Sequence, residues 1–95
     1  MKVYCVFTCD AWKSRSSMNL CTVCTSASAL RRVLLGGIRN EIFDFGDDSA
    51  TFEKNAKAFA TAWHQNQIDN SIPWDVVNDV KYAFVEEAIT NSNPF

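Results

Sequence analysis

Residues 2–25 read KVYCVFTC, then DAWKSRSSM, then NLCTVCT. The outer two runs are rich in Val, Tyr, Phe and Thr, which favour extended strands. We therefore expect strands at residues 2–9 and 19–25, joined as a hairpin by residues 10–18. This nine-residue connection is longer than the roughly two to five residues usual in a hairpin, which indicates a role beyond turning the chain.

A first helix is expected over residues 28–40, with Ser26 or Ser28 as its N-cap. Its apolar residues recur at helical spacing: Leu30, Val33, Leu34 and Ile38. Gly36 and Gly37 weaken this helix, since each costs up to ~1 kcal/mol relative to Ala. The helix therefore either ends near these glycines or continues to residue 40.

A short strand is expected at residues 42–45, and a second helix follows it. Asp48 or Ser49 is the expected N-cap of that helix, and Glu53 lies in its first turn, where negative charge is favoured. Its apolar residues again keep helical spacing: Phe52, Ala56, Phe59, Ala60 and Trp63. Such a stripe is typical of a core-facing helix, and we expect it to pack against the sheet.

The C-terminal third contains a short helix or turn and one ambiguous segment. Pro73 opens a short turn or helix that extends through Asp79. Residues 81–90 fit both a helix and a strand, of which we favour the strand, and residues 90–95 are expected to be a frayed tail. The predicted fold class is α+β: a small, mostly antiparallel sheet, made of the N-terminal hairpin and one or two further strands, packed against two helices.

Length and composition fit one folded domain over residues 1–95. The chain is 47% hydrophobic and 13% aromatic, with a net charge of −2, which excludes the low hydrophobicity and high charge of disordered chains. No apolar run approaches the roughly 20 residues that a bilayer span requires. Asp10 interrupts the N-terminus before a signal-peptide apolar region develops, so a cytoplasmic protein that does not engage membranes is expected.

Charge is distributed unevenly along the sequence. Six of the nine basic residues lie in residues 1–40 with Asp10 as the sole acid, and ten of the eleven acidic residues lie in residues 41–95. Such asymmetry can steer a charged partner. We favour the simpler interpretation, in which the two halves intermingle in the fold and neutralise each other.

The four cysteines have the spacing C-x3-C and C-x2-C, which raises the possibility of a zinc site. Cys5 and Cys9 share one face of an extended strand, whereas Cys21 and Cys24 are three residues apart and point to opposite faces. Convergence of all four thiolates would break the second strand. We therefore expect buried free thiols, with no metal and no cofactor.

Conventional catalytic machinery is sparse. His64 is the single histidine, and nothing near it in sequence supplies a nucleophile and an orienting group. Gly36 and Gly37 lack the Lys-Ser/Thr that follows a phosphate-binding loop. We therefore do not expect an enzyme.

The loop at residues 10–18 is the candidate binding site. Its candidate residues are Asp10, Trp12, Lys13, Ser14, Arg15, Ser16 and Ser17. An indole, two cations and three hydroxyls can hold an anion, stack on a base or form a protein-binding hot spot. A structural role is equally open: Trp12 would then cover the core, Asp10 and the serines would cap loop amides, and the cations would be solvated.

The segment TCDAWKSRSSM at residues 8–18, followed by Asn19 and Leu20, resembles a group of small uncharacterised bacterial proteins from gut Firmicutes and their phages or mobile elements. The resemblance covers roughly residues 1–26, with a weaker similarity at residues 82–91. It implies a biological setting and no particular activity.

These observations lead to two hypotheses of different classes. The first is a non-enzymatic binding module, a phage or mobile-element accessory protein that engages a host macromolecule, such as a host protein, through the loop at residues 10–18. The second is nucleic-acid or phosphate-ligand binding through the basic N-terminal half. The pI of 5.2 and the lack of a recognition motif disfavour nucleic acid.

Overall fold

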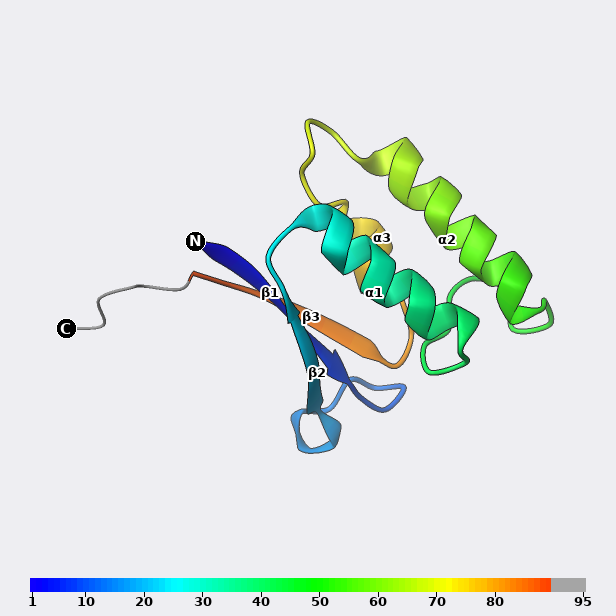
Figure 1. Cartoon of the computed structure of the whole chain (residues 1–95). Helices are drawn as coiled ribbons and strands as arrows, with labels where there is room; N and C mark the ends of the chain where they lie inside the picture. Colours follow the sequence, from blue (N-terminus) through cyan, green and yellow to red (C-terminus); the bar gives the residue numbers. More distant parts are fainter. Residues whose placement is uncertain (90–95) are drawn as a thin grey trace.

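In a computed structural model that describes residues 1–89, a three-stranded antiparallel sheet carries helices on one face (Figure 1). The strands are β1 (Lys2–Thr8), β2 (Asn19–Cys24) and β3 (Ala83–Ile89), in the order β2-β1-β3. The helices are α1 (Ala27–Arg39), α2 (Phe52–Asn66) and α3 (Trp74–Asn78), with a 3-10 turn, η1 (Arg15–Ser17), in the first loop. The α+β class and the strand after residue 81 are confirmed, and the predicted frayed tail at residues 90–95 lies outside the described residues.

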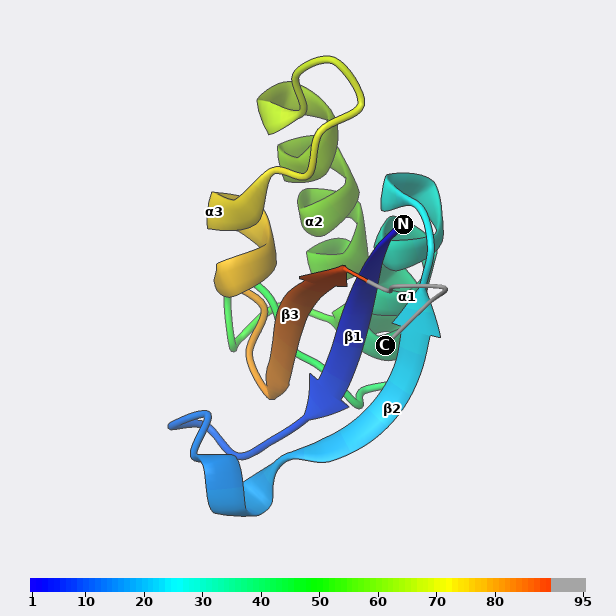
Figure 2. The ribbon, with the colours of Figure 1, turned by 90° about the vertical axis from the view of Figure 1, so that its left-hand side faces the viewer.

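The helices form two layers over the sheet. α1 lies against β2 and α3 against β3, while α2 packs on α1 and α3 on the side away from the strands (Figures 1 and 2). The prediction that the α2 stripe packs directly on the sheet is therefore wrong, because α1 and α3 already cover the narrow sheet. Ala56, Phe59 and Trp63 of that stripe are buried, whereas Phe52 at the start of α2 is exposed.

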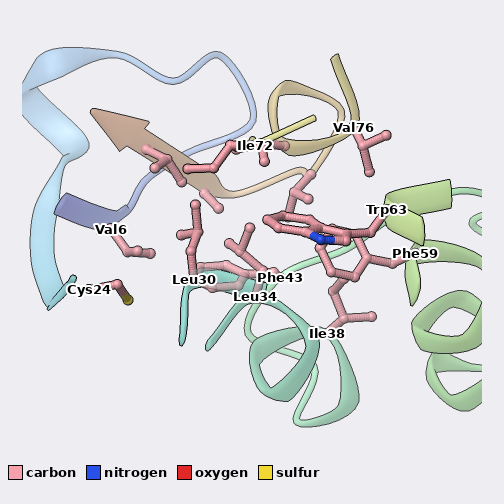
Figure 3. Packing of buried hydrophobic residues seen from close by; sticks show 14 of the residues in the cluster. Val6, Cys24, Leu30, Leu34, Ile38, Phe43, Phe59, Trp63, Ile72 and Val76 are labelled. Atoms are coloured by element: carbon pink, nitrogen blue, oxygen red, sulfur yellow. The ribbon is translucent and has the colours of Figure 1, made fainter. Parts of the chain in front are cut away.

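The core lies between the sheet and the helices, and every layer contributes to it (Figure 3). Its main apolar side chains come from β1, from α1 and from α2: Val6, Leu30, Leu34, Ile38, Phe59 and Trp63. The ring of Phe59 meets Phe45 edge-on at 5.4 Å between centroids and lies 5.9 Å from Trp63. This aromatic contact joins α2 to the segment that follows α1.

Ser26 is the N-cap of α1, and its hydroxyl accepts a hydrogen bond from the Ala29 amide at 3.1 Å. The helix continues through both glycines to Arg39, so the early end near Gly36 and Gly37 is not observed. Gly37 is buried against the ring of Phe43, and this contact requires a residue without a side chain.

The strand predicted at residues 42–45 is wrong. The Ile42 and Phe43 amides both donate to the Gly37 carbonyl, which ties the segment to the end of α1, and only an isolated bridge links Asp44 to Lys81. The expected cap of α2 is also wrong, because Thr51 accepts from the Lys54 amide at 3.2 Å and serves as the N-cap. Asp48 and Ser49 lie in the preceding turn. Among residues 1–89, no helix is long and apolar enough to cross a bilayer.

Candidate functional site

A network of short-range hydrogen bonds centred on Asp10 holds the loop at residues 10–18. The Asp10 carboxylate accepts hydrogen bonds from the amides of Trp12 at 3.1 Å and Ser14 at 3.0 Å, and from the Ser14 hydroxyl at 2.6 Å. The Ser17 hydroxyl accepts from the Asp10 amide at 3.0 Å and donates to the Ser14 carbonyl at 2.7 Å. Asp10, Ser14 and Ser17 therefore fix the backbone of the loop.

The same hydrogen bonds hold the pKa of Asp10 below its ordinary value of 3.8, with the Ser14 hydroxyl as the largest cause. These donors stabilise the ionised carboxylate, and together they outweigh the opposing effect of burial on the pKa. Asp10 therefore carries its charge wherever the loop is folded near neutral pH.

Lys13 connects the loop to the helical side of the fold. Its backbone adopts a left-handed conformation with φ of 54°, and its ammonium donates to the Asn78 carbonyl at 2.9 Å, at the end of α3. One of the two loop cations thus already has an intramolecular partner.

Trp12 and Arg15 point to solvent. The Trp12 side chain is 86% exposed, so the alternative in which it covers the core is wrong. Arg15 is exposed in η1, and among residues 1–89 its guanidinium has no hydrogen bond or ion pair. Ser16 beside it is exposed as well. Of the seven candidate residues, Trp12, Arg15 and Ser16 are the ones available to a partner.

A second surface, which the sequence analysis did not identify, covers the side of the sheet away from the helices (Figure 2). Tyr4 and Val6 contact the helical core, so the alternate residues of β1 point outward. With their register partners they form the outer sheet face, defined as Val3, Cys5, Phe7, Leu20, Val23, Phe84, Glu86 and Ala88. Val3 is the buried member of this face.

The outer sheet face is unusually apolar. An antiparallel sheet with one solvated face ordinarily places polar residues outward, but here Glu86 is the single polar member. Leu20 is 59% exposed and Val23 is 48% exposed, and the rings of Phe7 and Phe84 lie 6.1 Å apart. The sequence contains a signal for this apolar face, because in β1 both Val3, Cys5 and Phe7 and the residues between them, Tyr4 and Val6, are apolar or aromatic.

The apolar end of the outer sheet face adjoins the loop. Phe7 pairs with Leu20 on β2 and with Phe84 on β3, and the chain enters and leaves the loop immediately beyond these pairs. The exposed indole of Trp12 therefore extends from a loop whose base is flanked by the exposed Leu20 and the half-buried Phe7 and Phe84.

The cysteines lie on both sides of the sheet. Cys24 is buried in the core, whereas Cys21 is exposed and lies at the irregularity where the register passes from Thr22 to Leu20. Burial raises the pKa of the Cys24 thiol. Within residues 1–89 no three His, Cys, Asp or Glu side chains cluster in a way that could hold a metal ion.

The basic and acidic halves of the chain meet in the fold. Lys2 in β1 forms an ion pair with Glu87 in β3 at 3.3 Å, although both side chains remain partly exposed. This contact supports the interpretation in which the two halves neutralise each other.

Neither a family model, nor a curated protein, nor a solved structure matches the chain.

Proposed function

We propose that this chain is a non-enzymatic binding module that engages a protein partner through Trp12 and Arg15. The observation that carries the proposal is the 86% exposure of Trp12 on a backbone held by the Asp10 network. A Trp side chain buries ~150–250 Å² when covered, which makes it one of the strongest anchors a surface can offer. Trp and Arg are also the residues most enriched in binding hot spots.

The fixed loop backbone favours binding because less conformational freedom is lost on association. Asp10, Ser14 and Ser17 form hydrogen bonds with one another, and the indole of Trp12 projects from the turn that they hold. The partner surface that fits this arrangement has an apolar pocket for Trp12 and a carboxylate at its rim for Arg15.

Protein is favoured over nucleic acid because, among residues 1–89, Arg15 is the one loop cation without an intramolecular partner. Lys13 already donates to the Asn78 carbonyl, so Arg15 alone would have to contact phosphates. Nucleic-acid binding ordinarily uses several cations, each of which releases counterions. We further propose a cytoplasmic setting in which the partner belongs to a host of a phage or mobile element.

The test begins with a photo-crosslinking amino acid at position 16, since Ser16 is exposed and lies beside Arg15. Capture identifies a partner, which is then purified for measurement of Kd by calorimetry. Trp12→Ala is expected to weaken binding about 30-fold or more, the effect of a hot-spot residue. Arg15→Ala is expected to weaken it about tenfold.

Two matched variants control for changes elsewhere on the surface. Ile68→Ala removes another apolar side chain, 70% exposed, and Arg32→Ala removes another exposed cation; neither should change Kd. An unchanged Kd in Trp12→Ala would refute the proposal. Binding that falls steeply with salt and is competed by oligonucleotides would assign the loop to nucleic acid instead.

A further inference from the structure

A second candidate site lies at the opposite end of the fold from the loop at residues 10–18 (Figures 1 and 2). Here the start of α1 and the C-terminal half of α2 border a hollow of about 610 Å³. This volume is in the range of roughly 300–1,000 Å³ that small-molecule sites occupy.

The polar side chains that line the hollow are neutral or basic. Its polar side chains include Arg31, His64, Gln67 and Asn70, and no Asp or Glu among residues 1–89 lines it. Arg31 is half-buried, yet within the described part of the chain its guanidinium has neither a hydrogen bond nor an ion pair. A guanidinium without a carboxylate partner can pair with an anion.

Trp63 supplies a second, independent donor. Its side chain is 2% exposed, and its indole N–H, visible as the nitrogen in Figure 3, has no acceptor among residues 1–89. Every fully buried side-chain nitrogen or oxygen among residues 1–89 has a hydrogen-bond partner. An indole N–H without an acceptor is therefore not fully buried and contacts solvent. Trp63 is also one of the residues that line the hollow.

The start of α1 adds backbone donors. The side chain of Ser26 caps the Ala29 amide. Ala27 and Ser28 also line the hollow, and their amides precede the first intrahelical hydrogen bond. The 13-residue helix directs the positive end of its dipole to this point.

We propose that this hollow binds a small phosphate monoester. Arg31 pairs with two phosphate oxygens, while the Trp63 indole and the amides at the start of α1 donate to the remaining oxygen positions. The rest of the hollow, bordered by Gln67 and Asn70, accommodates the organic part of the molecule. A phosphate offers three terminal oxygens and up to two charges, which suits this set of donors better than a carboxylate.

The proposal is tested by ¹⁵N NMR titration of the full chain with inorganic phosphate and with 5′-AMP at constant ionic strength. The indole signal of Trp63 and the amides of Ala27 and Ser28 should shift together and saturate. Adenosine, which lacks the phosphate, should produce no saturable shift of these signals.

Two neighbouring arginines on α1 provide the matched comparison. Arg31→Gln should weaken binding about tenfold or more, because it removes a charge-assisted bidentate contact. Arg32→Gln should change the affinity by less than about twofold, since Arg32 is exposed and does not line the hollow. If Arg31→Gln does not fold, Arg31→Lys replaces it, and a weaker affinity is again expected because the planar fork is lost.

Three results would overturn the proposal. The first is the absence of saturation up to about 20 mM ligand, well above millimolar affinity. The second is an equal loss of affinity in the Arg31 and Arg32 variants, which would indicate non-specific attraction. The third is equal binding of acetate and phosphate, which would contradict the ligand class. Trp12→Ala should leave phosphate binding intact, so this proposal and the loop proposal fail separately.

Discussion

The ring of Phe43 lies where a side chain on Gly37 would have to be. A Cβ added to Gly37 would lie 2.6 Å from Cε2 of Phe43 and nearer still to Cδ2. Phe43 is buried, and its amide donates to the Gly37 carbonyl at 3.1 Å, so the two residues are joined by backbone and by packing. This contact fixes how the chain leaves α1.

We predict opposite effects for alanine at the two adjacent glycines. Gly37→Ala should lower the free energy of unfolding by about 1–3 kcal/mol, because Phe43 must move to relieve the overlap. Gly36→Ala should raise it by about 0.5–1 kcal/mol, since nothing lies within 4 Å and Ala favours the helix. Guanidinium denaturation of both variants measures the difference, and equal stabilities would contradict the placement of Phe43.

Asn55 gives a second prediction on the same side of the molecule. It is buried, and its side-chain amide donates to the Asp47 carbonyl at 2.9 Å. Asn55→Ala should destabilise the fold by about 1–3 kcal/mol, because the carbonyl loses its buried donor. Asn66→Ala is the control: its amide makes a similar 2.8 Å bond to the Ala62 carbonyl in an exposed position, and its loss should cost less than about 1 kcal/mol. A similar loss in both variants would argue against a supporting role for Asn55.

The periodic parts of the fold could be predicted from the sequence, because each depends on local spacing. The strands at residues 2–9 and 19–25 and the stripe through Phe59 and Trp63 follow directly from it. The layer in which α2 lies could not be predicted, since an apolar stripe is the same whether it meets a sheet or another helix. Gly37 illustrates the same limit: its low helix propensity is outweighed by a contact with a residue that follows the helix.

The sequence identifies the candidate loop, but it does not predict which of the loop residues are available to a partner. The sequence indicated an Asp, an indole, two cations and three hydroxyls, and each could serve either binding or the loop itself. The contacts in the structure separate the residues that hold the loop from those that are exposed. Asp10 is hydrogen-bonded within the loop and Lys13 to the Asn78 carbonyl, whereas Trp12 and Arg15 are exposed. The outer sheet face could not be predicted in the same way, because residues on both sides of β1 are apolar and either side could face the helices.

The Asp10 network predicts a pH dependence of loop order. The folded-state pKa of Asp10 lies below its ordinary value of 3.8, so its stabilising contribution is complete above that value and is lost as pH falls through the folded pKa. The amides of Trp12 and Ser14 should stay protected from hydrogen exchange until the pH falls below 3.8.

Asp10→Asn should increase exchange at the same two amides at neutral pH, because the neutral amide is a weaker acceptor than the carboxylate. Glu53→Gln, which removes an exposed acidic charge on α2, should leave them unchanged. Amides of Trp12 and Ser14 that exchange equally fast in Asp10→Asn and in the parent chain would show that the carboxylate does not order the loop.

Cysteine labelling tests which way β2 faces. Cys21 is exposed, whereas Cys24 is buried and burial raises the pKa of its thiol, so less of it is the reactive thiolate. A thiol reagent at neutral pH should modify Cys21 in the folded chain and reach Cys24 at least ~100-fold more slowly, through opening of the structure. Cys21→Ser should abolish the fast reaction at β2, and Cys24→Ser should leave it unchanged. Mass spectrometry of the labelled peptides assigns each rate. A fast reaction at Cys24 would mean that the side of β2 we assign to the core faces water, and the outer sheet face would then have to be redefined.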